Sequence, residues 1–220
     1  MIVIILFVNM MIIMQIVNLN FWGWKMGSSQ KQKADNHDRL LAIAAKEFRT
    51  KGLGGLSVAE LMSAAGLTHG GFYSHFASRE ALVTEALDRA FDDARHDLFQ
   101  EFNPRQDNAL EAFIGTYLSP MHRDDPGRGC VLATLSTDVQ HSDEETRALY
   151  TRRFKTYVDE VAALIGGDGK EDAHAEAMAI LSMLAGAVVI SRALNNDSLS
   201  RKVLRNARIL LTEWRGRKKT

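Results

Sequence analysis

The chain has 220 residues, of which 46% are apolar and 25% charged, and its formal net charge is zero. This composition is typical of a folded protein with a sizeable core, and it excludes a disordered tail-like chain or a uniformly basic one. The single cysteine excludes an intrachain disulfide and indicates a reducing compartment, and three prolines among many Ala, Leu, Glu and Arg residues predict an all-α fold.

Residues 1–25 form an apolar leader that has three interpretations. A signal peptide is disfavoured, because no basic residue precedes the apolar run and no clear cleavage site follows it. Residues 2–24 have the length of a membrane anchor, with aromatic residues at the end where the interface would lie. Alternatively, translation begins at Met26 and the leader is not part of the native protein. We favour the start at Met26, because the apolar run is interrupted by three polar amides: Asn9, Gln15 and Asn18.

The first helix is expected to begin at Asn36 or Asp38 and to end at Gly52. Its apolar residues recur at helical spacing and predict a buried face made of Leu40, Leu41, Ala44, Ala45 and Phe48.

Residues 57–76, SVAELMSAAGLTHGGFYSHF, predict two short helices joined by a tight turn. Ser57 followed by Glu60 is a capping box, in which each side chain satisfies a backbone N–H of the other residue. Gly66 is expected to end the first of these helices, because glycine enters the left-handed conformation at low cost.

The second short helix is expected to begin with Thr68 as its N-cap. Phe72 and Phe76, spaced i and i+4, would bury its inner face. Its outer face would carry small or hydrogen-bonding residues and no carboxylate, which suits a helix in the major groove of DNA. These outer residues are His69, Gly70, Tyr73, Ser74 and His75.

The segment GLTHGGFYSHFASREAL resembles the recognition helix of TetR/AcrR-type transcriptional regulators, and LLAIAAKEFRTKGLGGLSVAELMSAAG resembles the two helices before it. The resemblance implies a DNA operator as partner. It implies that Tyr73 and His75 contact phosphates or the groove edge, and that Arg79 contacts a phosphate. His69, Gly70, Gly71 and Ser74 would lie where base edges are read. The complete predicted DNA-binding set is Ser57, Thr68, His69, Gly70, Gly71, Tyr73, Ser74, His75 and Arg79.

The charges are distributed unevenly along the chain. Residues 25–76 contain seven Lys and Arg against four Asp and Glu, whereas residues 77–200 contain twelve against twenty-two. Residues 201–220 contain eight against one. A basic segment around the helix-turn-helix suits contact with phosphates, and an acidic body avoids it.

Beyond the motif, the apolar pattern predicts helices over 79–102, 107–118, 130–139, 144–165, 170–194 and 198–215, with a loop over 119–129. The middle of the 170–194 helix is apolar nearly all round and must be covered on every side. We therefore expect a helix-turn-helix domain over 26–80 and a helical regulatory and dimerisation domain over 81–220, the TetR-like arrangement. Two copies would pair through the helices near 170–194 and 198–215.

The resemblance also implies an unidentified small-molecule effector bound among the middle helices. The residues predicted to line its pocket are Leu98, Phe99, Phe113, Tyr117, Cys130, Leu135, Phe154 and Tyr157, although aromatic residues at helical spacing are often plain core. Cys130 has two interpretations: a reactive sensor whose pKa is lowered by a helix N-terminus and Arg128, or a small buried core residue.

The sequence thus predicts a ligand-responsive repressor that binds a palindromic operator as a homodimer in the cytoplasm, at the nucleoid. The alternatives are a regulator of the same type tethered to the membrane through residues 2–24, and an enzyme built on a helical bundle. No convergent acid–base group, cofactor motif or metal-ligand spacing supports an enzyme, so we predict neither a catalytic residue, a cofactor nor a metal.

Overall fold

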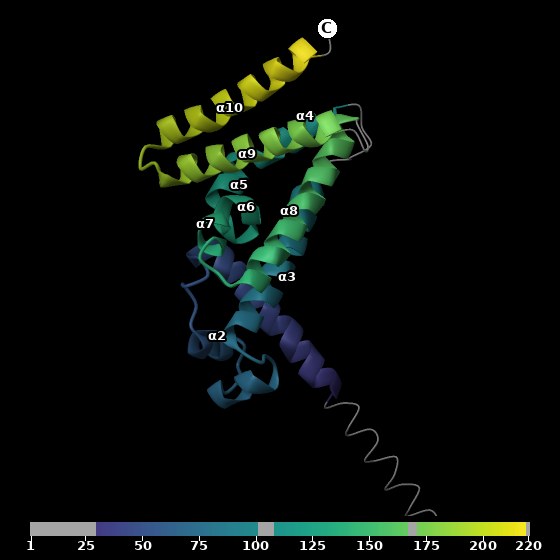
Figure 1. Cartoon of the computed structure of the whole chain (residues 1–220). Helices are drawn as coiled ribbons and strands as arrows, with labels where there is room; N and C mark the ends of the chain where they lie inside the picture. The colour runs from purple at the N-terminus through teal and green to yellow at the C-terminus, as the bar shows by residue number, and fades with distance from the viewer. Residues whose placement is uncertain (1–29, 101–107, 167–170, 219–220) are drawn as a thin grey trace, which may run out of the picture. The chain divides into compact units, whose positions relative to one another are not determined.

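The computed structural model describes residues 30–100, 108–166 and 171–218, and every regular element among them is helical, as predicted (Figure 1). Residues 1–40 and residues 41–220 form two separate units. In the first unit the chain is helical from residue 30 onward. The apolar leader over 1–25 lies outside the described residues, so all three interpretations of it stay predictions.

The first helix spans residues 30–51, so it begins earlier than the predicted start at Asn36 or Asp38. The residues before Asn36 include Gln, Lys and Ala, which favour helix strongly enough to extend it. Ala44, Ala45 and Phe48 are buried, as their spacing predicts. Gly52 ends the helix with φ of 81°, a left-handed conformation that glycine adopts most readily.

Helix α2 (Val58–Ala64) and the 3₁₀ helix η1 (His69–Ser74) follow and contact each other. Helix α3 (Arg79–Gln100) comes next and has 22 residues, which gives it a length of about 33 Å. It runs from the helix-turn-helix into the body, where it packs along α8 (Glu144–Ile165).

Residues 119–129, predicted as a loop, form two short helices, so that prediction is wrong. After α4 (Ala109–Tyr117) come α5 (Pro120–Asp124) and the 3₁₀ helix η2 (Pro126–Arg128). Ser119 caps α5 by accepting a hydrogen bond from the His122 N–H at 3.1 Å, and Pro120 occupies the first helical position. Proline is favoured there because its missing N–H needs no partner.

The single helix predicted over 130–139 is also wrong, because it is broken at Leu135 into α6 (Val131–Thr134) and α7 (Ser136–Val139). The hydroxyl of Ser136 donates to the carbonyl of Leu132 at 2.6 Å, and that of Thr134 donates to the carbonyl of Cys130 at 3.1 Å. Hydroxyl groups that bond the preceding turn compete with the backbone ladder of a helix.

Three long helices complete the body, close to their predicted bounds: α8, α9 (Glu171–Ala193) and α10 (Asp197–Lys218). Asp143 caps the start of α8, and Gly166 ends it with φ of 84°. Helix α9 packs against α8, α10 and α6 (Figure 1).

Helix α9 is covered on one face only, although its composition predicts cover on every side. Met178, Met183, Val189 and Ile190 are exposed on it, and Leu199, Ile209 and Leu210 are exposed on α10. Among the described residues α9 is also the helix long and apolar enough to cross a membrane, a property that core helices share. Within one copy of the chain, α9 and α10 therefore leave an apolar surface open to solvent.

Candidate nucleic-acid interface

Backbone and side-chain caps fix both ends of α2. The Ser57 hydroxyl accepts a hydrogen bond from the Glu60 N–H at 3.2 Å, and the Ser57 N–H donates to the Glu60 carboxylate at 2.8 Å. This is the predicted capping box. At the other end Gly66 has φ of 66°, the Gly66 N–H donates to the Ser63 carbonyl and the Leu67 N–H donates to the Met62 carbonyl. That pair of bonds is a Schellman motif, so the predicted stop at Gly66 is confirmed.

The second short helix differs from its prediction in type. Residues 69–74 form a 3₁₀ helix, in which the N–H groups of Gly71 and His75 donate to carbonyls three residues earlier. Two adjacent glycines weaken an α-helix by about 1 kcal/mol each relative to alanine, which favours the shorter 3₁₀ form. Thr68 occupies the N-cap position, but its hydroxyl makes no capping bond.

The two phenylalanines of this segment anchor it to the core. Phe72 and Phe76 are each 2% exposed, and their ring centroids lie 5.4 Å apart. Tyr73, next to Phe72 in the chain, is instead 76% exposed. Buried anchors on one side of a short helix therefore hold the neighbouring residues outward.

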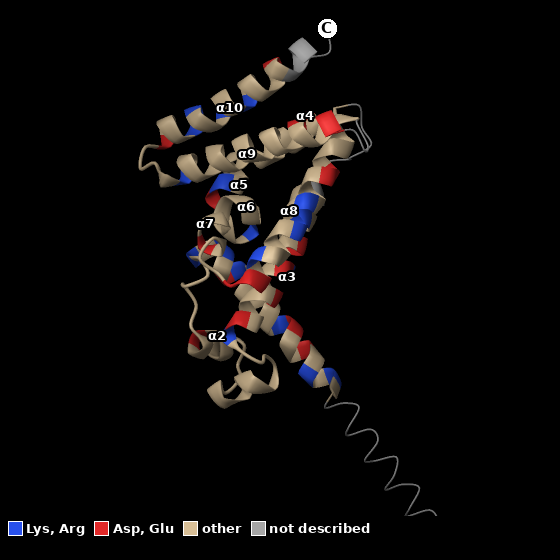
Figure 2. Ribbon diagram, viewed as in Figure 1, with Lys and Arg blue, Asp and Glu red and all other residues tan. Residues whose placement is uncertain are grey.

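The outward surface is polar, small and uncharged. His69, Gly70 and Ser74 are exposed together with Tyr73, whereas Gly71 and His75 are half-buried. A Cβ atom added at Gly70 would meet no atom within 4 Å. The segment carries no Lys, Arg, Asp or Glu, as Figure 2 shows. Such a surface allows close approach of another molecule and offers hydrogen bonds without repelling phosphates.

At least three of the predicted DNA contacts already have hydrogen-bond partners within the chain. The Ser74 hydroxyl donates to the carbonyl of Gly71 at 2.6 Å. The Ser57 hydroxyl donates to the Glu60 carboxylate at 2.7 Å in the capping box. The Arg79 guanidinium donates to the carbonyl of Leu53 at 2.7 Å, so it holds the loop before α2. Their roles toward DNA stay predictions.

Two hydrogen bonds that the sequence does not predict connect the DNA-side elements to α7 and to Gly129 at the end of η2. The Leu53 N–H donates to the Asp138 carboxylate of α7 at 2.8 Å. Arg49, which is 5% exposed, donates to the carbonyl of Gly129 at 3.4 Å. These partners are about 80 residues apart in the chain, so no local motif could reveal them. Together with the bond from Arg79, the first bond holds both backbone groups of Leu53.

Most residues predicted to line an effector pocket are close-packed. Phe113, Tyr117, Cys130 and Leu135 are fully buried, Leu98 and Tyr157 nearly so, and Phe154 is half-buried. The side chain of Phe99 lies outside the described part of the chain. The aromatic rings of Phe113 and Tyr117 pack edge to face at 5.8 Å. As a pocket, this set stays a prediction.

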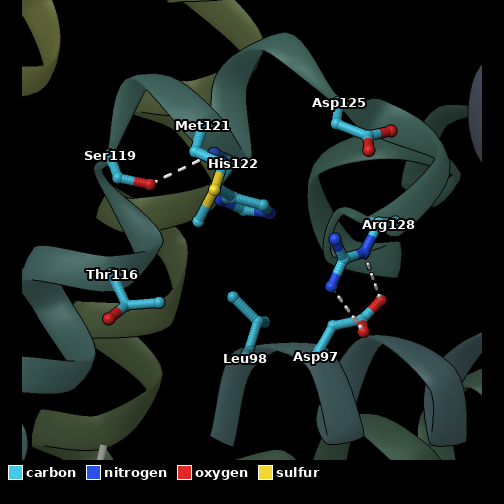
Figure 3. Close-up of a pocket in the computed structure, with 8 residues that line it drawn as sticks. All are labelled: Asp97, Leu98, Thr116, Ser119, Met121, His122, Asp125 and Arg128. Carbon is cyan, nitrogen blue, oxygen red and sulfur yellow. Dashed lines mark hydrogen bonds and ion pairs between the residues drawn. The ribbon is translucent and has the colours of Figure 1, made fainter. Parts of the chain in front are cut away.

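Leu98, one of the residues predicted to line the effector pocket, borders a small cavity (Figure 3). The volume of this cavity is about 40 Å³. The Arg128 guanidinium closes one side through its ion pair with Asp97 at 3.1 Å, and His122 and Met121 lie opposite. A drug-sized ligand needs about 300 Å³ or more. This cavity has room for a few water molecules at most.

Cys130 lies in a buried polar cluster behind this cavity. Its N–H donates to His122 Nε2 at 2.9 Å, so His122 Nδ1 carries the proton that is donated to the Tyr117 carbonyl at 2.6 Å. Burial lowers the pKa of His122 to about 4, against the opposing effect of that bond. Burial also raises the pKa of the Cys130 thiol, which contradicts the interpretation of Cys130 as a reactive sensor with a lowered pKa. The alternative of a buried core residue is confirmed by its zero exposure.

Two family models match the chain. The model of the tetR family of bacterial regulatory proteins matches residues 40–86, and that of the C-terminal domain of LmrA/YxaF-like transcriptional regulators matches residues 107–206. The chain belongs to the TetR family. This family consists of transcriptional regulators and not of enzymes.

Curated relatives of this TetR-family chain are repressors. The transcriptional repressor KstR2 of Mycolicibacterium smegmatis is 33% identical over 88 residues, which cover 40% of this chain and 42% of the relative. KstR2 of Rhodococcus jostii is 29% identical over 126 residues, covering 56% and 60%. The repressor DhaR of a Mycobacterium species is 25% identical, covering 54% and 60%. Each match thus spans about half of both proteins.

Solved structures show the same fold. A TetR-family regulator from Cytophaga hutchinsonii has a TM-score of 0.68 at 21% identity, covering 83% of this chain and 96% of the other. Reduced NemR of E. coli has a TM-score of 0.63 at 20% identity, covering 81% and 96%. The TetR-like all-helical fold is therefore shared over most of the chain.

Proposed function

We propose that this protein is a sequence-specific DNA-binding repressor that acts as a homodimer in the cytoplasm. The observation that carries the proposal is the outward surface of η1, where Tyr73 is 76% exposed beside the buried Phe72. An exposed tyrosine on a rigid, uncharged segment of a helix-turn-helix is suited to a phosphate or the groove edge. Membership of the TetR family and the repressor activity named for KstR2 and DhaR support it.

The residues of the segment would divide their roles according to their exposure. His69, Gly70 and Ser74 are the exposed groups placed to approach base edges, with Gly70 allowing the backbone itself to come close. The hydroxyl of Tyr73 would donate a hydrogen bond to a phosphate oxygen. Phe72 and Phe76 are scaffold, because both are buried.

A second copy of the chain would complete the DNA-binding unit. Two recognition segments bind successive major grooves only if they are held about 34 Å apart. The exposed apolar residues of α9 and α10, among them Ile190 and Leu210, form a surface that a second copy would bury. Gly186 supports this placement, since a Cβ atom there would meet nothing within 4 Å and the helices of two copies could approach closely.

Effector control would act through the bonds that hold Leu53. Because Asp138 accepts from the Leu53 N–H and Arg79 donates to its carbonyl, a movement of α7 is transmitted to the loop before α2. A ligand shifts the operator affinity only if it binds better to one of the two arrangements of these elements. Replacing Asp138 would therefore weaken the response to an effector without touching DNA.

The proposal is tested by footprinting the purified full chain on DNA upstream of its own gene. We expect a symmetric protected site, and we expect Tyr73→Ala to weaken protection by about a hundredfold, since each copy loses a charge-assisted hydrogen bond of about 1.5 kcal/mol. Met121→Ala is the matched control, because Met121 is another large exposed side chain, 59% exposed and far from η1 in the chain. Equal protection by wild type and Tyr73→Ala would contradict the assigned surface.

A further inference from the structure

Helix α10 and the junction of α4 and α5 enclose a basic groove that the DNA-binding role does not use. Its volume is about 560 Å³, within the range of sites for drug-sized ligands. Leu118, Pro120 and Leu204 form an apolar wall. The polar side carries four cationic residues of α10 at helical spacing: Arg201, Lys202, Arg205 and Arg208.

Three of the four cations of this groove are not neutralised by the residues that the structure describes. Lys202, Arg205 and Arg208 form no ion pair with any of the described residues. The acid that lines the groove, Asp197, is already engaged, because it pairs with Arg123 at 3.0 Å and with Arg201. The groove therefore presents about three uncompensated positive charges, and Figure 2 shows the corresponding blue segments along α10.

Arg208 is held over the groove by the neighbouring helix. Its guanidinium carbon lies 3.4 Å from the point where a Cβ atom on Gly115 of α4 would stand. The missing side chain of Gly115 thus provides the seat for the planar guanidinium. Arginine forks of this kind bind carboxylate and phosphate groups through paired hydrogen bonds.

Arg201 and Arg208 of the groove lie on the side of α10 opposite to Leu199 and Leu210, which belong to the apolar surface proposed for dimerisation. At 100° per residue, Leu199 and Leu210 fall roughly 160° around the helix from Arg201 and Arg208. Leu204 and Leu211, which are buried, lie between the two sets. Lys202 and Arg205 lie about 20° and 40° from the exposed Ile209. Pairing of two copies through the apolar residues would therefore leave the Arg201 and Arg208 side of the groove accessible and would border Lys202 and Arg205.

We propose that this groove binds the effector, and that the effector is an amphipathic anion, with a carboxylate or phosphate group and an apolar body. The anionic group would contact Arg205 and Arg208, and the apolar body would lie against Leu118 and Pro120. The role of this groove as the effector site rests on the proposed function. The binding of an amphipathic anion to the groove does not depend on that function.

A series of bonds connects the groove with the DNA-side loop. Pro120 of its wall begins α5, and His122 of α5 accepts from the Cys130 N–H at the start of α6. Helix α7 follows, and its Asp138 holds Leu53. An anion that moves α5 against α10 thus acts on a continuous set of bonded elements.

The binding is tested by calorimetry on the full chain with octyl phosphate and octanoate, each below its micellar concentration, and with octanol and inorganic phosphate as partial ligands. We expect at least one of the two amphipathic anions to bind with one site per chain, and octanol and inorganic phosphate to bind at least tenfold more weakly. The affinities of octyl phosphate and octanoate are compared, and the tighter ligand shows whether the groove prefers a phosphate or a carboxylate group. Equal binding of octanol would overturn the role of the cations, and equal binding of inorganic phosphate would overturn the role of the apolar wall.

Matched variants locate the site. Arg205→Gln with Arg208→Gln is expected to weaken binding at least tenfold, whereas Arg152→Gln with Lys155→Gln, two exposed cations of α8, should change it less than twofold. Equal effects of the two double variants on octyl phosphate binding would refute the groove as the site. The calorimetry contains no operator DNA. It therefore measures anion binding to the groove even if the protein does not bind DNA. Release of operator DNA by octyl phosphate, reduced in Asp138→Asn, then tests the link to regulation.

Discussion

The helix-turn-helix and the α9–α10 pair expose surfaces of opposite kinds. The first presents His69, Ser74 and Tyr73, which water solvates well, while the second presents Met183, Ile190 and Leu210. Exposed apolar area costs about 25 cal/mol per Å², whereas exposed polar groups cost little. A polar surface can stay free until DNA arrives, and an apolar surface favours a permanent partner. We therefore expect the proposed pairing of two copies to be longer-lived than the binding of DNA.

The largest effect is expected from a charge in the apolar surface. Ile190→Glu would place a carboxylate in the proposed interface in both copies, at a cost of about 4 kcal/mol or more, or about a thousandfold in the dimer dissociation constant. Sedimentation analysis would show monomers at micromolar concentration, and operator affinity would fall with them. Lys155→Glu on α8 is the control, and a dimer retained by Ile190→Glu would exclude this surface as the interface.

The second comparison contrasts two adjacent aromatic residues of η1. Phe72→Ala removes a buried ring and should lower the free energy of unfolding by about 3–5 kcal/mol, with loss of DNA binding as a consequence of unfolding. Tyr73→Ala removes an exposed ring and should change stability by about 0.5 kcal/mol. Chemical denaturation of both variants measures the difference. If Tyr73→Ala were as unstable as Phe72→Ala, its effect on DNA would say nothing about contact.

The element types were predictable from sequence wherever a local physical rule decides them. The capping box at Ser57, the stop at Gly66 and the long helices α3, α8, α9 and α10 all follow from residues near one another in the chain. The break at Leu135 was missed because it depends on which hydroxyl groups turn back to the backbone. The 3₁₀ form of η1 was missed because two glycines outweigh the helical spacing of Phe72 and Phe76.

The candidate site was predictable only in part for the same reason. Exposure of Tyr73 beside a buried Phe72 follows from their adjacent positions on a short helix. The bonds of Leu53 with Asp138 and of Arg49 with Gly129 depend on tertiary packing across about 80 residues, and no spacing rule reaches that far. The groove along α10 likewise requires the position of α4, which the sequence leaves undetermined.

The buried side chain of His122 should make the stability of the folded protein decrease in acid. Burial lowers the pKa of His122 to about 4, below its ordinary value of 6.5, so the folded state holds the neutral ring. Below pH 6.5 the unfolded chain gains a proton that the folded one does not. Stability should therefore be full above pH 6.5 and should decrease by about 3 kcal/mol as the pH falls to 4. Denaturation across this range measures the slope.

His122→Gln is the control for this pH dependence, because it keeps a hydrogen-bonding side chain and cannot titrate. Carboxylates also contribute to acid unfolding, but their contribution is common to both proteins. The variant should be less stable than the wild type at pH 7 and should show a flatter profile between pH 6.5 and 4. Identical slopes for the two proteins would mean that His122 is accessible to protons in the folded state.

The smallest effects are expected from two glycine variants of the helix-turn-helix. One glycine is required by the backbone conformation, and the other lies on the outward surface. Gly66 has φ of 66°, and alanine in this left-handed region should cost about 1–2 kcal/mol. Gly70 has an ordinary φ and open space where a Cβ atom would stand, so Gly70→Ala should leave the protein as stable or raise stability by up to about 1 kcal/mol. Operator affinity should nevertheless fall for Gly70→Ala, because a methyl group there separates the backbone from DNA. Chemical denaturation and operator binding are measured for both variants. If Gly70→Ala bound its operator with unchanged affinity, the backbone at Gly70 would not approach the major groove of DNA.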